Sequence, residues 1–395
     1  MDLFKKCKAT VEAVKQAKSA NIYPYFTPIE SAQDHRVKIN GREYIMIGSN
    51  GYLGLAADPR LKKAAIEAIE KYGSTCSGSR FLNGTLDIHI KLEENLAQFF
   101  EKDGAIVFST GFQTNLGIIS SITSKDDIII IDKQDHASII DGCRLSFAEV
   151  RKFQHNDMKD LERILKSLPA DKGKLIVVDG VFSMEGDVIN LPEVVRLKNK
   201  YQARLLVDDA HGIGVMGKQG RGVCEHFGLL DKVDIIMGTF SKSFASLGGF
   251  VVADDDVITH IRHTARALIF SASMTPASVA SALQSLEIIK NEPSRRERLW
   301  EVTERVRAGF KEIGLDTGNS TTPVIPVIIG DDKKCFAFWK MLFESGVFAN
   351  PVISPATPPG RALIRTSYMS THTDDDISIV LEAFARCAKE FGLTK

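Results

Sequence analysis

The sequence predicts an α/β fold with a largely parallel sheet that helices cover on both faces. Short apolar runs recur between about residues 105 and 252, and helical or loop segments separate them. This alternation is typical of parallel strands buried on both faces. The length of 395 residues exceeds one ordinary core. We therefore expect a large domain of this kind and a smaller second one.

The composition is that of an ordinary globular protein. Hydrophobic residues make up 44% and charged residues 25% of the chain. Lys+Arg and Asp+Glu both number 50, so the chain has no excess positive charge that would favour nucleic-acid binding. The six cysteines form no CxxC pair, and no apolar run approaches the roughly 20 residues of a membrane span. We expect no secretory signal and a reduced, cytoplasmic setting.

The N-terminal residues predict a helix followed by a small sheet. The apolar residues at helix-like spacing among five lysines are Leu3, Phe4, Val11 and Val14. Such a helix could lie on an anionic membrane surface, at the inner membrane face, or serve as an arm that docks on another subunit or domain. Residues 37–47 alternate around Asn40-Gly41, which is a strong hairpin signal.

The central elements follow in chain order. The apolar residues of LKKAAIEAIEKYG are spaced to lie on one face of a helix. The Gly- and Ser-rich segment STCSGSRFLNGT predicts an exposed loop. The predicted strands are AIVF, DIIII, KLIVVD, RLLVD, VDIIM and GGFVVA. Helices are expected at DMKDLERILKSL and LPEVVRLKNKYQ. Ligands bind beyond the strand ends of such sheets, so the residues after these runs matter most.

The last third predicts a second domain. Thr275 can cap a helix that begins at Pro276, and ERLWEVTERVRAGFKEIG gives a second amphipathic helix. TPVIPVIIG and FANPVIS are strand candidates, and a Pro/Gly turn precedes a run that ends on Arg365. The closing helix, DDDISIVLEAFARCAKEFG, begins with acids that complement its dipole.

Two patterns indicate a nucleotide or metal site but lack the required context. HGIGVMG satisfies the GxGxxG fingerprint, yet KQGRG follows where a nucleotide-binding helix should form. His260 and His263 share one helix face, but no acid or cysteine joins them at ligand spacing. We therefore predict neither a dinucleotide site nor a metal site.

An acid, an imidazole and an amine follow neighbouring strands. Asp208 ends the RLLVD run, His211 lies three residues on, and Lys242 lies in GTFSKSF before Gly248-Gly249. Small hydroxyl residues around an amine suit a lysine bound to pyridoxal 5′-phosphate as a Schiff base, with an aspartate on the pyridine nitrogen. Asp208 is well placed for that role, and Asp209 is its rival.

Three further residues could contact a cofactor at the strand ends. Gly111 could direct main-chain N–H groups at phosphate, and Ser183 follows the KLIVVD run. His136 follows the DIIII run and could stack over a planar ring or orient a carboxylate, although a lone histidine is more often structural.

With these residues assembled, the chain resembles the α-oxoamine synthases, pyridoxal-phosphate enzymes of the fold-type I aminotransferase superfamily. The motifs that carry the resemblance span nearly the whole chain in the family's order: SNGYLGL, GSRFLNGT, STGFQTN, DHASIIDG, DGVFSMEGD, VDDAHGIGV and GTFSKS. The family's VDEAHS appears here as VDDAHG, which puts the contacts of the residue after His211 in doubt.

The resemblance implies an architecture. A mostly parallel, seven-stranded sheet between helices would form the large domain, and the C-terminal domain would be a smaller α+β unit. We expect residues 1–50 to form a helical arm and small sheet, 51–285 the large cofactor-binding domain, and 286–395 the small domain. The family also implies a homodimer with shared active sites.

The resemblance also assigns roles. Lys242 would bind the cofactor covalently and Asp208 would pair with the pyridine nitrogen, while His136 would stack on the ring and His211 would bond its phenolic oxygen. The residues expected to hold phosphate are Gly111, Phe112, Thr239 and Ser241, with Ser271 and Ala272 from the second subunit. The residues expected to bind the substrate carboxylate or contact substrate are Asn50, His136 and Arg365.

Within the family, three segments favour the bacterial branch that condenses L-serine with a long-chain acyl-CoA, palmitoyl-CoA. They are GTFSKSFASLGGF, FSASMTPASVA and LIRTSYMSTHT. Condensation of alanine with pimeloyl-CoA or of glycine with acetyl-CoA is the same-fold alternative. A noncatalytic subunit and an NAD-dependent oxidoreductase are rivals from other classes. The presence of Lys242 disfavours the noncatalytic one.

Overall fold

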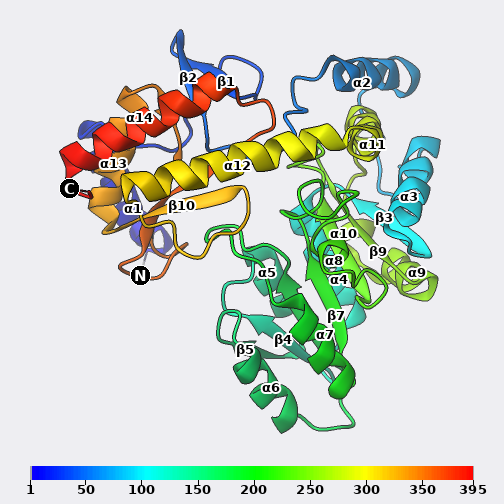
Figure 1. Cartoon of the computed structure of the whole chain (residues 1–395). Coiled ribbons are helices and arrows are strands. Elements are labelled where there is room, and N and C mark those ends of the chain that lie inside the picture. Colours follow the sequence, from blue (N-terminus) through cyan, green and yellow to red (C-terminus); the bar gives the residue numbers. More distant parts are fainter. Residues whose placement is uncertain (1, 395) are drawn as a thin grey trace.

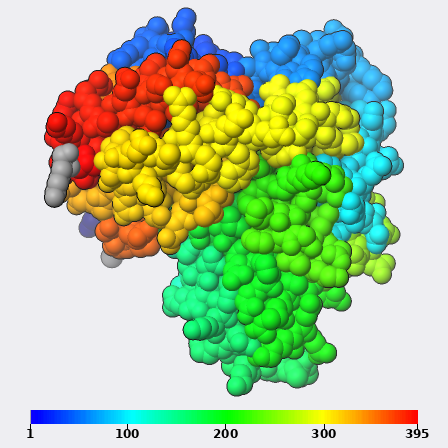
Figure 2. All heavy atoms as spheres, in the orientation of Figure 1, coloured from blue at the N-terminus to red at the C-terminus, as the bar shows by residue number. Residues whose placement is uncertain are grey.

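A computed structural model places residues 2–394 in a large and a small domain. The long helix α12 (Pro293–Ile313) runs from one to the other (Figure 1). In the space-filling view, red residues occupy the upper left, yellow residues extend from there to the right, and green residues form the lower part (Figure 2). The Pro at the first turn of α12 and Gly314 in the left-handed region at its end mark its limits.

The large domain is built on a seven-stranded sheet with strand order β3-β9-β8-β7-β6-β4-β5. Its strands are β3 (Gly104–Phe108), β4 (Ile128–Asp132), β5 (Glu149–Phe153), β6 (Lys174–Asp179), β7 (Arg204–Asp208), β8 (Ile235–Thr239) and β9 (Gly249–Ala253). All neighbours are parallel except β9, which runs antiparallel to both β3 and β8. The predicted mostly parallel, seven-stranded sheet is confirmed.

The strand β5 was absent from the sequence-based prediction because it lies at the sheet edge. Its residues Glu149, Arg151 and Lys152 are exposed, and only Phe153 is buried. An edge strand with charged side chains has no continuous apolar run. The six predicted runs, in contrast, coincide with the other six strands.

Apolar clusters fill both faces of the large sheet. Alternate residues of one strand enter different clusters, as Ile130 and Ile129 of β4 do. The helices that cover the sheet and its ends are α2 (Pro59–Tyr72), α3 (Asp87–Phe100), α4 (Gly111–Ile122), α5 (Ala137–Ser146), α6 (Met158–Ser167), α7 (Leu191–Lys200), α8 (Val223–His226), α9 (Asp255–Thr264), α10 (Arg266–Ile269) and α11 (Pro276–Asn291). Thr275 caps α11 as predicted, since its side chain accepts the Ser278 N–H.

The small domain contains two three-stranded sheets, β1-β2-β11 and β10-β13-β12. Their strands are β1 (Arg36–Ile39), β2 (Arg42–Met46), β10 (Val324–Gly330), β11 (Val347–Phe348), β12 (Asn350–Val352) and β13 (Ala362–Ser367). The predicted hairpin is present, with Ile39 opposite Arg42. However, β2 also pairs in parallel with β11, so this hairpin joins C-terminal residues in one core. The divisions at residues 50 and 285 remain predictions.

The remaining helices are η1 (Leu3–Lys6), α1 (Cys7–Ser19), α13 (Asp332–Glu344) and α14 (Asp374–Phe391). Thr373 and Asp376 form a capping box at the start of α14. No side chain of η1 or α1 is buried. Between residues 2 and 394, no helix combines the length and apolar character that a membrane crossing requires.

Candidate active site

A cavity of about 250 Å³ lies where β6, β7 and β8 end. The predicted site residues that line it are Gly111, Phe112, His136, Ser183, Asp208, His211, Thr239, Ser241 and Lys242. They come from loops that are far apart in the sequence, and the strand ends of the large sheet bring them together. This is the edge at which open α/β sheets bind ligands.

One end of the cavity suits an anion. The first helical hydrogen bond of α4 runs from Thr114 N–H to the Thr110 carbonyl, so the preceding Gly111 and Phe112 N–H groups lie outside the helix ladder. A Cβ at Gly111 would lie 2.7 Å from Thr239 Oγ1. Ser241 Oγ lies 2.9 Å from the same Thr239 oxygen. Hydroxyls and a helix N-terminus together form a phosphate-binding arrangement.

Asp208 also lines the cavity. Its Oδ2 accepts from Asn115 Nδ2 at 2.7 Å, and its Oδ1 accepts from Ala210 N–H at 3.1 Å. The rival Asp209 is fully buried and does not line the cavity. Its Oδ2 accepts the Val223 N–H at 2.6 Å instead. The geometry therefore favours Asp208 as the partner of a cofactor.

The glycine at position 212, where the family motif has serine, has a steric reason. A Cβ at Gly212 would lie 2.0 Å from Asp209 Oδ1, so a serine cannot occupy this position while Asp209 keeps its place. Burial raises the pKa of Asp209 to about 7. The glycine run at 212–217 forms turns, and the next helix, α8, begins only at Val223. A dinucleotide-binding helix is not present there.

Lys242 lies on the wall of the cavity and is surrounded by charged groups. Burial lowers the pKa of Lys242 to about 8, while the carboxylates of Asp208 and Asp179 oppose this shift. At neutral pH, the fraction of protein molecules in which Lys242 is an uncharged amine is therefore larger than for an ordinary lysine. A free amine is the form that reacts with a carbonyl group.

His211 contacts a tyrosine that the sequence-based prediction left without a role. Its Nδ1 lies 2.7 Å from the hydroxyl of Tyr52, and both residues are buried. Burial lowers the pKa of His211 well below its ordinary value, and Lys242 and Arg365 add to the shift. Tyr52 belongs to the SNGYLGL motif, and its fixed contact with His211 is a tertiary feature that spacing does not reveal.

Arg365 joins three distant segments beside the cavity. It lies on β13, is 4% exposed and donates from Nε to the Ser183 carbonyl at 2.6 Å. Its Nη2 donates to Asn50 Oδ1 at 2.8 Å. The two predicted substrate residues Asn50 and Arg365 are therefore in contact, next to Ser183 of the cavity wall.

Asp179 is a second carboxyl group that the sequence analysis did not select. It ends β6 directly opposite Asp208 of β7, lines the cavity, and accepts the His136 N–H at 2.9 Å. Burial and the charge of Asp208 raise the pKa of Asp179 well above its ordinary value. Its position at a strand end, which matches that of Asp208, was the available signal.

Ser271 and Ala272 lie next to α4 but outside the residues that line the cavity. Ser271 Oγ accepts from Gln113 Nε2 at 2.8 Å, and the Ala272 carbonyl accepts from Ser109. Their predicted contribution from a second subunit remains a prediction.

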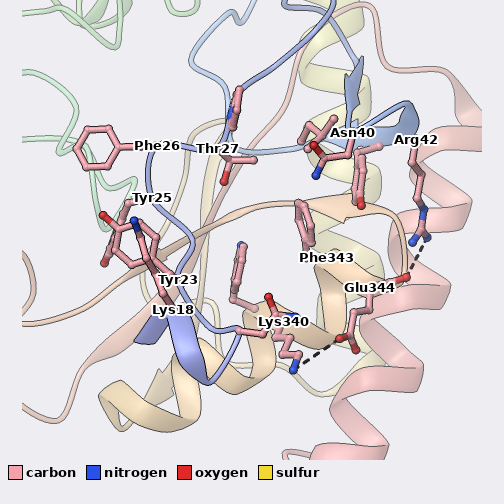
Figure 3. A pocket seen from close by; sticks show the side chains of 15 residues that line it. Lys18, Tyr23, Tyr25, Phe26, Thr27, Asn40, Arg42, Lys340, Phe343 and Glu344 are labelled. Carbon is pink, nitrogen blue, oxygen red and sulfur yellow. Dashed lines mark hydrogen bonds and ion pairs between the residues drawn. The ribbon is translucent and has the colours of Figure 1, made fainter. Parts of the chain in front are cut away.

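A second cavity, of about 500 Å³, lies between the N-terminal segment and α13 and contains none of the predicted site residues. Figure 3 shows Tyr23, Tyr25 and Phe343 around it, with the Lys340–Glu344 ion pair near its edge. Tyr44 stacks on Phe343 at a ring distance of 4.5 Å. The cavity is therefore separate from the strand ends of the large sheet.

The residues around the first cavity fit pyridoxal 5′-phosphate. Gly111 lies so close to Thr239 that a side chain at position 111 has no room. Main-chain N–H groups can therefore approach a phosphate there. Lys242 supplies an amine, and Asp208 supplies a carboxylate on the same cavity. An amine, an anion-binding helix end and an acid are the three groups that this cofactor requires.

The model of the family described as aminotransferase class I and II matches residues 42–384. The chain belongs to the aminotransferase class I and II family. This family member is 54% identical to the serine palmitoyltransferase of Sphingobacterium spiritivorum over 377 residues, which cover 95% of this chain and 94% of the relative. It is 42% identical to the 8-amino-7-oxononanoate synthase of Thermoanaerobacter pseudethanolicus, over 97% of each chain.

The fold comparison agrees with the sequence comparison. The solved structure of a serine palmitoyltransferase variant from S. paucimobilis, with bound PLP and myriocin, superposes with a TM-score of 0.97 at 36% identity. The match covers 100% of each chain. The predicted resemblance to the α-oxoamine synthases and the fold-type I architecture of this family member are confirmed.

Proposed function

We propose that the chain catalyses the pyridoxal-phosphate-dependent condensation of L-serine with palmitoyl-CoA, the first step of sphingolipid synthesis. The products are 3-ketodihydrosphingosine, CoA and CO2. The observation that carries the proposal is the 54% identity to a serine palmitoyltransferase over nearly the full length of both chains. Condensation of alanine or glycine with shorter acyl-CoAs is the alternative, because 8-amino-7-oxononanoate synthases share 42% identity.

When bound, pyridoxal phosphate supplies an electron sink for the carbanion that forms at the serine Cα. Lys242 would hold the cofactor covalently through its amine, and as a free amine it would be the base for the serine Cα proton. Its pKa of about 8 suits these roles near neutral pH. Asp208 would keep a proton on the pyridine nitrogen. His211, which contacts Tyr52, would bind the phenolic oxygen.

Arg365 and Asn50 bind the serine carboxylate on the β13 side of the cavity. A guanidinium can grip a carboxylate through two parallel hydrogen bonds, which fixes the orientation of the Cα bonds. His136 also lines the cavity and would stack on the cofactor ring. In the overall reaction, the serine Cα would form a bond to the thioester carbonyl carbon as the C–S bond to CoA breaks, and CoA would leave as the thiol. The carboxylate would then leave as CO2, and a proton would take its place at Cα.

A panel of amino acids and acyl-CoAs tests the reaction, with CoA release as the readout. We expect turnover with L-serine and palmitoyl-CoA to exceed turnover with alanine and pimeloyl-CoA or glycine and acetyl-CoA by at least about 100-fold, since a site that binds a substrate hydroxyl strongly rejects analogues without it. Activity confined to alanine or glycine with the shorter acyl chains would contradict the proposal.

The active sites are shared in a homodimer. Exposed apolar side chains support this part of the proposal. Phe112 and Leu247 are exposed and line the cavity, and Phe81, Leu82 and Phe270 are also exposed. The main chain of the 78–84 loop bonds to Ser273, and Ser271 contacts Gln113 of α4. Apolar regions of this kind mark interaction sites.

A peripheral contact with anionic lipid, through η1 and α1, completes the proposal. Leu3 and Phe4 are 68% and 72% exposed, and Val11 is 49% exposed. Five lysines accompany them on the same short segment: Lys5, Lys6, Lys8, Lys15 and Lys18. An exposed apolar stripe with lysines matches a lipid surface of negative charge. Both the acyl-CoA and the product carry long alkyl chains, which also partition into membranes.

Co-sedimentation with vesicles tests this contact. Substitution of Leu3 and Phe4 by aspartate is expected to weaken binding to phosphatidylglycerol vesicles by about tenfold or more, because two apolar side chains no longer enter the lipid. Ile379→Asp, at a position of α14 that is 42% exposed, is the matched control and should bind as the parent protein does. Unchanged sedimentation of the double variant would contradict the lipid contact, and a fall to monomer mass in light scattering would identify a docking arm instead.

A further inference from the structure

Asn115 of α4 lies between two polar groups of the active site. Its Nδ2 donates to Asp208 Oδ2 at 2.7 Å and to Ser138 Oγ at 2.8 Å. A carboxylate oxygen accepts hydrogen bonds, so the amide nitrogen and not the amide oxygen must face Asp208. Both amide hydrogens are therefore used, one on each partner. All three residues are buried.

The hydrogen of the Ser138 hydroxyl then has one partner left. Since Ser138 Oγ accepts from Asn115, its own hydrogen points at His136 Nδ1, which lies 2.7 Å away. The main-chain N–H of Ser138 approaches the same ring nitrogen at 3.3 Å, because His136 caps α5. Two donors on one nitrogen require that Nδ1 carries a lone pair. The neutral imidazole therefore carries its proton on Nε2.

The charges around His136 agree with a neutral ring. Loss of hydration lowers the pKa of His136, Asp208 opposes the shift, and Lys242 adds to it. The other titratable groups near the ring are His211, which follows β7, and Asp179 at the end of β6. The Asp179 carboxylate accepts the main-chain N–H of His136 and not a ring N–H. Within residues 2–394, Nε2 has no hydrogen-bond partner, and His136 lines the cavity. The Nε2–H group of the ring is therefore available to a ligand in the cavity.

The packing of α4 on α5 holds this arrangement. A Cβ at Gly142 of α5 would lie 3.0 Å from the Asn115 carbonyl, so the glycine allows the two helices to approach closely. The Asn115 side-chain oxygen, Oδ1, is buried and lacks a partner among the described residues. An unpaired buried oxygen destabilises a fold. The amide is thus oriented by its two donor contacts despite this cost.

We propose that Asn115 is a positioning residue that couples Asp208 to His136. One amide hydrogen orients the Asp208 carboxylate toward the pyridine nitrogen. The other, through the Ser138 hydroxyl, fixes the Nε2–H tautomer of His136, which donates to the cofactor or to the substrate carboxylate. The inference rests on the proposed function for the roles of Asp208 and His136. The hydrogen-bond order itself is a property of the chain alone.

Three variants separate the two arms of this network. Asn115→Leu removes both donors with little change in volume, and Ser138→Ala removes only the hydroxyl. Ser285→Ala is the matched control, since Ser285 is equally buried and loses one hydrogen bond to the Phe244 carbonyl, away from the cavity. Circular dichroism establishes that each variant is folded.

Two readouts are independent of turnover. The tautomer and titration of His136 are followed by side-chain ¹⁵N resonances of the histidine-labelled protein without cofactor, assigned with His136→Gln. The dissociation constant of pyridoxal phosphate is measured by fluorescence titration. Because neither readout uses serine or acyl-CoA, failure of the proposed reaction would leave both measurements valid.

The parent protein should show a protonated Nε2 and an unprotonated Nδ1. Ser138→Ala should raise the titration midpoint of His136 by about one pH unit, as loss of a donor to the neutral form does, and leave cofactor affinity within about threefold. Asn115→Leu should move both readouts, with cofactor binding weaker by about tenfold. Ser285→Ala should move neither.

The opposite pattern would overturn the coupling. An Nδ1–H tautomer in the parent protein, or an Asn115→Leu protein in which His136 titrates as in the parent, would show that Asn115 does not act on His136. An equal loss of cofactor affinity in Ser138→Ala would show that Asp208 does not depend on the Asn115 amide alone. If Asn115→Leu fails to fold, Ser138→Ala, which lacks one oxygen, still decides the tautomer.

Discussion

Replacement of Lys242 by alanine is expected to abolish turnover and the visible absorbance band of the bound cofactor. In the proposed function, this amine would bind pyridoxal phosphate covalently and would also be the base for the Cα proton. Loss of a general base alone reduces rates by about 10²–10⁴-fold, and loss of the covalent link adds to this. Absorbance spectroscopy of the purified variant with added cofactor, and CoA release, measure the two effects.

Lys242→Arg is the informative companion to this variant. It keeps a cation beside Asp208 and Asp179 but has no amine that can react with an aldehyde. We therefore expect it to lack the band as well. Lys125→Ala, at an exposed position beyond the C-terminal end of α4, should retain both band and turnover. Retention of the band in Lys242→Ala would remove the basis of the proposed site.

Replacement of Arg365 by alanine should raise the KM for serine by about 10- to 100-fold, the effect of losing a charged hydrogen-bond partner. Cofactor affinity should change much less, because Arg365 contacts the Asn50 side chain and the Ser183 carbonyl rather than the phosphate end of the cavity. Steady-state kinetics at varied serine and a cofactor titration separate the two quantities.

The buried position of Arg365 requires a second variant. Arg365→Ala leaves the Ser183 carbonyl and Asn50 Oδ1 without their donor, so the protein also loses stability. Arg365→Lys retains a charge but not the planar fork, and should show an intermediate KM with smaller loss of stability. An unchanged response to serine in folded Arg365→Ala protein would contradict its assigned role.

Much of the fold could be predicted from the sequence because buried parallel strands have continuous apolar runs. The edge strand β5 could not, since its charged residues Glu149, Arg151 and Lys152 face solvent. The pairing of β2 with β11 was also missed. It joins Ile45 to Val347, and no local pattern reports a contact across 302 residues.

The candidate site shows the same division between local and tertiary signals. Lys242, Asp208 and His136 follow predicted strands, so strand ends and motifs were enough to select them. Tyr52 and Asn115 were present in quoted motifs, but their roles depend on contacts with His211 and Asp208 that only the fold creates. Periodicity places a residue on an element, and it does not reveal which distant side chain that residue meets.

The contact between Asn50 and Arg365 has a consequence for how the protein folds. The two residues are separated by 315 positions, yet together they form the proposed carboxylate-binding side of the cavity. Closing a loop of that length costs conformational entropy and comes late in folding. The residues of the proposed cofactor site, from Gly111 to Lys242, all precede β13 in the chain. The proposed serine side also needs Arg365 of β13, so we expect a chain truncated before Ala362 to lack the complete substrate site.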